Sequence, residues 1–266
     1  MADEKIRLGG MALQNGVLVH GPTAWAIAVR TDDGELRVSS GRKRLRGAEV
    51  TNPLLRGPAR LLDAMLLLPR IRRARPEARL PFERPLVFGS MVASAVAVRL
   101  LRALPRPGPV VKELLGGSIS LLPATLALRG SSLAAYHGAE HISIGTYEHG
   151  EPRGKEHERC GSHLIGPLLV TSTLGAALAG RAPEPARGVA RVGAAVGALA
   201  AATEVFSWMV RHPEHPVARA LARPGHELQQ RVATADPDPA QLEVAEAALQ
   251  ACLALETDGA QHTHRG

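Results

Sequence analysis

The stretches PLVFGSMVASAVAV at residues 85–98 and LLGGSISLLPATLAL at residues 114–128 contain no charged side chain. Two more charge-free runs follow at residues 164–180 and 192–203. Each run is shorter than the roughly 18 residues that identify a membrane-spanning helix on their own. Each approaches that length when it is extended through a flanking charged residue. These flanking residues are Arg99, Lys112, Arg191 and Glu204.

The order of the four runs favours two helical hairpins. Short proline-rich links at residues 105–109 and 181–187 join the runs in pairs. Small residues crowd the fourth run, as close packing between helices in lipid requires. We therefore predict a mainly α fold with about four membrane-spanning helices in two hairpins across residues 85–210. The alternative is a soluble helical protein in which the runs are buried core helices.

Residues 1–48 predict a small β unit, because short apolar runs there are separated by turn signals. Residues 11–20 and 23–30 are each expected to form one strand, with Gly21-Pro22 between them. The triplet Asp32-Asp33-Gly34 predicts a hairpin turn into a further strand at residues 35–39.

Residues 49–84 form a basic segment that we expect to lie on a membrane surface. Between Arg37 and Arg84 there are 13 Lys or Arg and only 4 Asp or Glu, within a chain of net charge +7. Leucines alternate with arginines over residues 54–73, which predicts an amphipathic helix. We expect membrane lipid as the partner and no nucleic acid, since Phe82 is the segment's only aromatic residue. The same pattern also fits a helix packed on a soluble core.

The C-terminal part is expected to be helical and cytoplasmic over residues 211–258, followed by a disordered tail at 259–266. Asp238-Pro239 followed by Gln241 is a typical helix start, with a capping box and proline in the first turn. An excess of arginine marks the cytoplasmic side of a membrane protein. Four spans then place both termini and a loop at residues 129–163 on the cytoplasmic side of a bacterial inner membrane. Because the N-terminal residues include no apolar segment, we expect no cleavable signal peptide.

The expected loop at 129–163 carries a cluster of potential metal ligands. His137 and His141 are four residues apart with Glu140 between them, so on a helix both imidazoles share one face. The pattern H-x-x-E-H is the inverted zinc-hydrolase motif, in which the glutamate acts as general base. His157 and Cys160 follow closely. We predict a divalent metal site, with zinc the favoured ion, formed by His137, His141, His157 and Cys160. Glu140 is the candidate catalytic residue.

Several alternatives remain open at this point. Four protein ligands would give a closed structural site, whereas three would leave room for a catalytic water. Glu148, His149 and Glu204 are alternative third ligands or partners of a ligand's N–H group. Gly138 weakens a helix, so the motif could form a turn instead. Cys160 could also be a reactive thiol beside Arg159.

The motifs around this cluster resemble those of the YqhQ-like family of bacterial integral membrane proteins. Those motifs are residues 136–141, 147–150, 157–162, 9–22, 53–57, 224–229 and 236–245. The resemblance implies a multi-span membrane protein described as a metal-dependent enzyme of uncharacterised function, with no established catalytic residues. Met11, Asn15 and His20 stand where the family pattern has Gln, Glu and Arg. If that motif contributes an acid to the site, the activity of this chain would differ.

The predicted function is therefore a metal-dependent hydrolase at the cytoplasmic face of the membrane, acting on lipid or peptide. The alternative from another class is a non-enzymatic membrane scaffold or assembly factor, in which the metal only holds the loop together.

Overall fold

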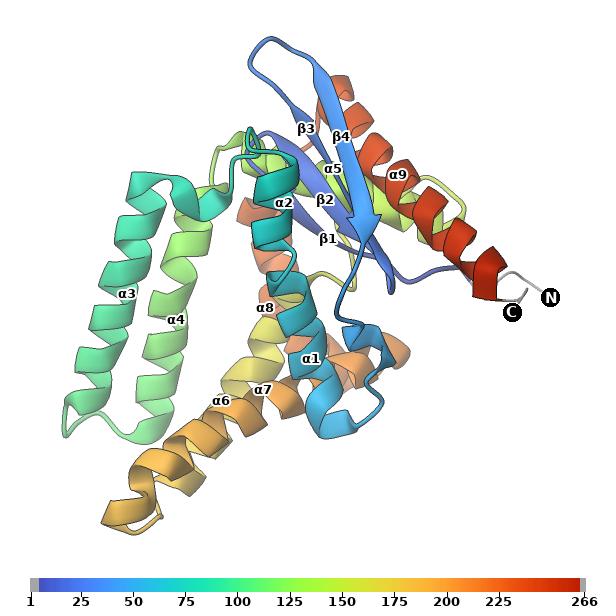
Figure 1. Ribbon diagram of the computed structural model, residues 1–266. Coiled ribbons are helices and arrows are strands. Elements are labelled where there is room, and N and C mark those ends of the chain that lie inside the picture. The colour runs from blue at the N-terminus through green and yellow to red at the C-terminus, as the bar shows by residue number, and fades with distance from the viewer. Residues whose placement is uncertain (1–4, 264–266) are drawn as a thin grey trace.

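The computed structural model describes residues 5–263 and is mainly helical, with a small four-stranded sheet near the N-terminus (Figure 1), as the sequence predicted. The strands are β1 (Gly9–Leu13), β2 (Gly16–His20), β3 (Ala24–Arg30) and β4 (Leu36–Arg42). The α-helices are α1 (Pro53–Met65), α2 (Leu68–Ala74), α3 (Pro85–Ala103), α4 (Pro109–Leu128), α5 (Ser132–His149), α6 (Ile165–Ala179), α7 (Arg187–Arg211), α8 (Pro216–Leu228) and α9 (Pro239–Thr263). Short helical turns lie at Gly47–Glu49, Pro81–Glu83, Gly161–Leu164, Glu184–Ala186 and Gln229–Ala233.

The sheet is an antiparallel meander in the order β1-β2-β3-β4. The prediction of a single strand over residues 11–20 was wrong, because the chain reverses between Leu13 and Gly16, which pair with each other. Asn15-Gly16 is itself a hairpin signal. The Asn15 side chain holds the turn in place by donating to the carbonyls of Arg30 and Glu77, both at 3.1 Å.

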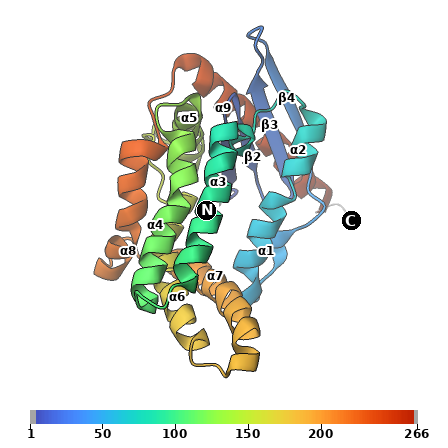
Figure 2. The same ribbon diagram turned by 90° about the vertical axis from the view of Figure 1, so that its left-hand side faces the viewer.

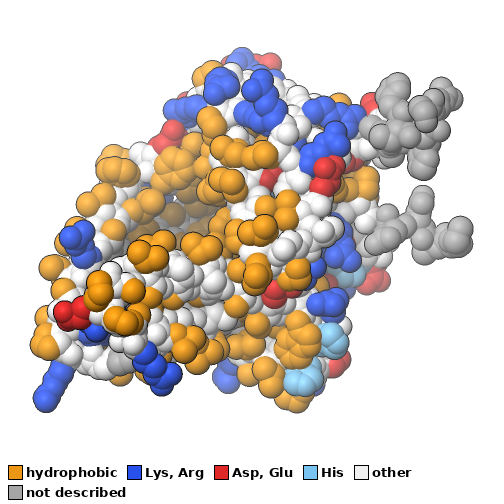
Figure 3. Space-filling model, turned by 60° about the horizontal axis from the view of Figure 1, so that its bottom comes forward, with side chains coloured by type: hydrophobic (Ala, Val, Ile, Leu, Met, Phe, Trp, Pro, Cys, Tyr) orange, Lys and Arg blue, Asp and Glu red, His pale blue; other side chains and the backbone are white. Residues whose placement is uncertain are grey.

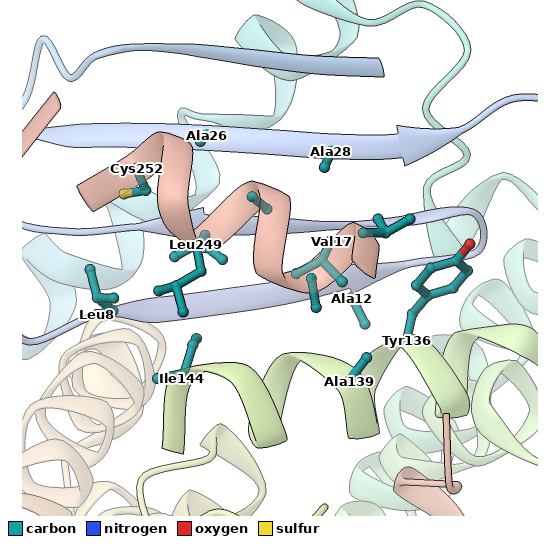
Figure 4. Close-up of a cluster of buried hydrophobic side chains, with 14 of the residues drawn as sticks. Leu8, Ala12, Val17, Ala26, Ala28, Tyr136, Ala139, Ile144, Leu249 and Cys252 are labelled. Carbon is teal, nitrogen blue, oxygen red and sulfur yellow. The ribbon is translucent and has the colours of Figure 1, made fainter. Parts of the chain in front are cut away.

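Other segments pack on both faces of the sheet, so its central strands β2 and β3 are almost fully buried. Alternate residues such as Val17, Ala26 and Ala28 face α5 and α9, and Figure 4 shows these side chains between the strands and the two helices. The intervening residues face α2 and the segment after it. They are Leu13, Leu18, Trp25, Ile27 and Val29, packed on Leu67, Ile71, Ala78 and Leu80. The sheet therefore fixes the position of α5, which carries the H-x-x-E-H motif.

The segment at residues 54–73 forms two helices with different surroundings. In α2, Ile71 is fully buried against the sheet. In α1, by contrast, large apolar side chains are exposed. The exposed residues are Leu54, Leu55, Leu61, Leu62 and Met65. The first half thus has the apolar surface expected of an interfacial helix, and the second half belongs to the core.

Four helical segments are long and apolar enough to cross a membrane. They are Pro85–Ala103, Val110–Leu128, Gly161–Ala179 and Glu184–Arg211, and only 11%, 17%, 22% and 17% of their apolar windows are buried. Exposed apolar surface of this extent marks contact with a membrane or with another protein. The hairpins α3–α4 and α6–α7 extend to the same side of the sheet (Figures 1 and 2), and hydrophobic side chains gather on the face in Figure 3, which is hollowed among them.

The segments around the hairpins are more ordered than the sequence suggested. Most of the expected loop at 129–163 is helix α5. Helix α9 begins with the expected capping box, since the backbone of Gln241 donates to Asp238 Oδ1 and that of Asp238 to Gln241 Oε1. The same helix continues to Thr263, into the expected tail, whose residues 264–266 lie outside the described residues.

Membrane fractionation tests the hairpins directly. We expect the full-length protein to remain in the membrane pellet after alkaline carbonate washing and to require detergent for release, because four spans cannot leave lipid without exposing their apolar surface. Immunoblotting of pellet and supernatant measures this. Release by carbonate alone would contradict the spanning arrangement.

Candidate metal centre

The H-x-x-E-H motif lies on helix α5, as the helical interpretation required. Gly138 does not break the helix but allows another segment to approach it. A Cβ atom at Gly138 would overlap the carbonyl oxygen of Ala235. The backbone N–H of Ala235 in turn donates to the carbonyl of Ala134 at 2.9 Å. The glycine therefore lets residues 233–235 pack against α5 beside the motif.

Three of the four predicted metal ligands come together. One ligand atom from each of His137, His141 and Cys160 lies within 4.8 Å of the other two. Cys160 Sγ is 3.6 Å from His137 Nε2. Bonds of about 2.3 Å to sulfur and about 2.05 Å to nitrogen, at a tetrahedral angle, place two such atoms about 3.6 Å apart. The three ligand atoms could thus hold one metal ion.

Backbone carbonyls orient both histidines toward the cluster. His137 Nδ1 lies 2.8 Å from the carbonyl oxygen of Ala233, and His141 Nδ1 lies 2.7 Å from that of Lys155. Each carbonyl accepts the Nδ1–H, so Nε2 of each ring carries the lone pair that a metal ion requires. Burial, followed by the nearby His137, lowers the pKa of His141 to about 3, which keeps the ring neutral. His141 is therefore in the neutral form that binds a metal.

The fourth predicted ligand, His157, lies next to the cluster but is engaged elsewhere. Its ring centroid is 5.5 Å from that of His141. Its Nε2 lies 3.1 Å from Glu148 Oε2, and its Nδ1 accepts the backbone N–H of Arg159 at 3.3 Å. Both ring nitrogens thus have partners within the protein. The structure brings together His137, His141 and Cys160 without His157.

The alternative ligands are also placed elsewhere. Glu148 pairs with His157 and Arg159. His149 Nε2 lies 3.4 Å from Glu158 Oε1. Glu204 pairs with Arg56 of α1, between helices α1 and α7. Among the described residues, these three side chains are therefore committed to other contacts.

Glu140 lies beside the cluster and is buried, with 6% of its surface exposed. Its carboxylate packs on Gly10 of β1, where any Cβ atom would overlap it. Burial raises the pKa of Glu140 to about 7, the nearby Cys160 adds to the effect, and His137 opposes it. No hydrogen bond joins the carboxylate to another residue in the described range 5–263, so it is free to act on a molecule in the adjoining cavity.

That cavity, which we call the metal-site cavity, has a volume of about 580 Å³. One part of its wall contains His137, Glu140, His141 and Cys160. Another part comes from the end of α4, a candidate membrane span, through Leu121, Ala124, Ala127 and Leu128. The potential metal ligands and the buried carboxylate therefore share one cavity with the apolar surface of a spanning helix.

The structure does not favour Cys160 as a reactive thiol. Burial raises the pKa of the Cys160 thiol in the absence of a metal. Arg159, the expected activator, pairs with Glu148 instead. A reactive cysteine requires a lowered pKa, so a metal-ligand role suits this residue better.

The sequence analysis did not identify the groups from other parts of the chain that contact the site. Gly10, the carbonyls of Lys155 and Ala233, and His20 in the cavity wall come from segments far apart in the chain. The Gly9-Gly10 pair was the only local signal, since adjacent glycines in a strand indicate a close approach by another group.

Comparison with known proteins identifies one domain. Residues 131–255 match a family described as a protein of unknown function, DUF1385. The match contains all three clustered ligands and Glu140, and it begins just before α5. Searches of curated proteins and of solved structures found no match.

Proposed function

We propose that this protein is a metal-dependent hydrolase of a bacterial inner membrane, with both termini and the metal centre on the cytoplasmic side. His137, His141 and Cys160 hold a divalent ion, and Glu140 is the general base. The observation that carries the proposal is the convergence of three ligand atoms beside a buried carboxylate in one cavity. The Arg-rich segment at the sheet end of the hairpins and the resemblance to the YqhQ-like family support this location.

Zinc suits the donor set best. Imidazole nitrogen together with thiolate sulfur favours zinc over calcium or magnesium, which prefer oxygen ligands. Three protein ligands are typical of catalytic zinc sites, whereas structural sites use four. A zinc ion bound there would act as a Lewis acid and lower the pKa of a water molecule from 15.7 to about 7.

Glu140 then supplies the proton transfers that hydrolysis of an acyl bond requires. Its carboxylate takes a proton from water, and the water oxygen forms a bond with the carbonyl carbon of an ester or amide. The bond from that carbon to the leaving oxygen or nitrogen breaks. Glu140 returns the proton to the leaving group, giving a carboxylic acid and an alcohol or amine.

The geometry favours catalysis over a purely structural metal. A scaffold whose metal only holds a loop together needs no cavity and no unpartnered carboxylate. Here α5 is already fixed by packing on the sheet and α9, and His157, the residue that could close the site, pairs with Glu148.

Metal analysis tests the ligand assignment. We expect the full-length protein, purified in detergent, to contain about one zinc per chain, and the His137→Ala/His141→Ala variant to contain almost none, because a single remaining thiolate cannot retain the ion. Inductively coupled plasma mass spectrometry measures the content. His149→Ala/His212→Ala is the matched control, since it removes two histidines outside the cluster and should keep the metal. Equal zinc in wild type and the His137/His141 variant would refute the site.

A further inference from the structure

A second cavity adjoins the metal-site cavity and differs from it in charge. Its volume is about 950 Å³, and it lies between the start of the chain, the ends of β2 and β4, and helix α1. The two cavities share Leu8, Gly9 and His20 as wall residues. We call the second one the basic cavity. The two cavities therefore lie side by side, on either side of these shared residues.

Cations outnumber acids in the wall of the basic cavity. Among the described residues 5–263, the cationic residues of the wall are Lys5, Arg7, Arg42, Lys43, Arg46 and Arg60, and the acids are Asp63 and Glu256. This imbalance gives the cavity a positive potential that attracts anions.

Both acids are already engaged by the protein. Asp63 Oδ2 lies 2.9 Å from Lys43 Nζ in a buried ion pair. Glu256 accepts hydrogen bonds from the backbone N–H groups of Thr23 and Ala24, at 2.8 and 2.7 Å. Neither carboxylate is left to neutralise the remaining cations.

Most of the remaining cations have no acidic partner in the part of the chain that the structure describes. Arg46 pairs with Glu49 at 3.0 Å. Within residues 5–263, no carboxylate lies within ion-pair distance of Arg7, Arg42 or Arg60. A phosphate group would find two or three guanidinium groups around one cavity, the arrangement that bidentate phosphate recognition uses.

The position of α1 shows where such a phosphate would come from. Arg60 lies on α1, whose exposed apolar side chains include Leu61 and Leu62. A helix of this kind lies at the boundary between lipid headgroups and acyl chains. The basic cavity, which α1 helps to form, would then lie at headgroup level, while the apolar wall of the metal-site cavity comes from a candidate spanning helix.

We infer that the basic cavity binds the phosphate of an anionic lipid whose acyl chain lies against α4 in the metal-site cavity. The substrate part of this inference rests on the proposed function. It names the substrate class as anionic phospholipid and the scissile bond as the acyl ester between headgroup and chain. The binding part stands on the basic cavity alone.

Binding of a short-chain lipid tests the inference. The probes are dihexanoyl phosphatidate, its uncharged counterpart dihexanoylglycerol, and inorganic phosphate, titrated calorimetrically into full-length protein in neutral detergent. We expect phosphatidate to bind more tightly than both other probes. Each arginine near anionic lipid contributes about a fivefold gain in affinity, so Arg7→Gln/Arg60→Gln should weaken phosphatidate binding about 30-fold.

Arg44→Gln/Arg73→Gln is the matched control, because it removes two exposed arginines that lie outside the cavity wall. Its affinity should stay within about threefold of wild type. Equal weakening in both double variants would overturn the inference, as would equal binding of phosphatidate and dihexanoylglycerol. Inorganic phosphate binding as tightly as phosphatidate would also overturn it, because the ligand would then be a free phosphate compound.

A further variant separates this inference from the proposed function. His137→Ala/His141→Ala should lose zinc, and in this zinc-free background Arg7→Gln/Arg60→Gln should still weaken phosphatidate binding about 30-fold, since the basic cavity does not contain the two histidines. If wild type contains zinc but Arg7→Gln/Arg60→Gln does not weaken phosphatidate binding, the lipid inference is refuted while the metal centre still stands.

Discussion

Replacing Glu140 with glutamine is expected to lower the rate of acyl hydrolysis by a factor of about 100–10,000 while zinc stays bound. Glutamine has the same shape, so it fits against Gly10 as the glutamate does. It cannot accept the proton of the attacking water, and a positioned general base contributes a factor of this size. Glu140 is also outside the cluster of three ligand atoms, so the metal should remain.

The assay for this prediction uses p-nitrophenyl butyrate, a small ester that the metal-site cavity can admit, with product release followed by absorbance. Zinc content is measured on the same samples. Glu151→Gln is the control, because Glu151 is an exposed glutamate just beyond the end of α5. Retention of activity within about threefold in Glu140→Gln would remove Glu140 as the base. A wild-type rate equal to that of His137→Ala/His141→Ala would contradict hydrolysis at this centre.

The local part of the site was predictable from the sequence. The spacing of His137 and His141 fixes both rings on one helix face whatever the rest of the fold does, because helix geometry is regular. The charge-free runs likewise identified the four candidate spans, since length and apolar content are local properties. These inferences needed no knowledge of which segments meet.

The non-local part of the site was not predictable in the same way. Spacing places His157 and Cys160 three residues apart in a segment without regular structure, and it does not say which one faces α5. Contacts with Glu148 and the Arg159 backbone turn His157 away, while Cys160 approaches His137. The contact of Glu140 with Gly10 joins residues 130 positions apart, so no local pattern could reveal it.

The prediction of one strand over residues 11–20 failed because the chain turns between Leu13 and Gly16. The apolar residues between Met11 and His20 suggested one strand, but Asn15-Gly16 in their middle is a turn signal. In the structure the turn docks against the segment that follows α2, because Asn15 Oδ1 accepts the backbone N–H of Arg79 at 3.0 Å. The extra strand brings β1, and with it Gly10, next to α5.

Loss of the buried partner of Lys43 is expected to destabilise the fold strongly. Lys43 Nζ and Asp63 Oδ2 are 2.9 Å apart, and their side chains are only 3% and 6% exposed. Asp63→Ala would leave the Lys43 ammonium buried without a counter-charge, which costs about 3–5 kcal/mol. His20 Nδ1, 3.1 Å from Lys43 Nζ, accepts a hydrogen bond but brings no negative charge. The thermal midpoint in detergent should fall by about 6–20 °C.

The pair of Arg46 and Glu49 provides the matched control for burial. Its N–O distance of 3.0 Å is almost the same, but its side chains are 59% and 63% exposed. Because water screens an exposed pair, Glu49→Ala should cost less than about 1 kcal/mol. Lys43→Met/Asp63→Leu removes both buried charges and should restore most of the stability that Asp63→Ala loses. If Asp63→Ala and Glu49→Ala lower the midpoint equally, the buried pair does not hold β4 to α1.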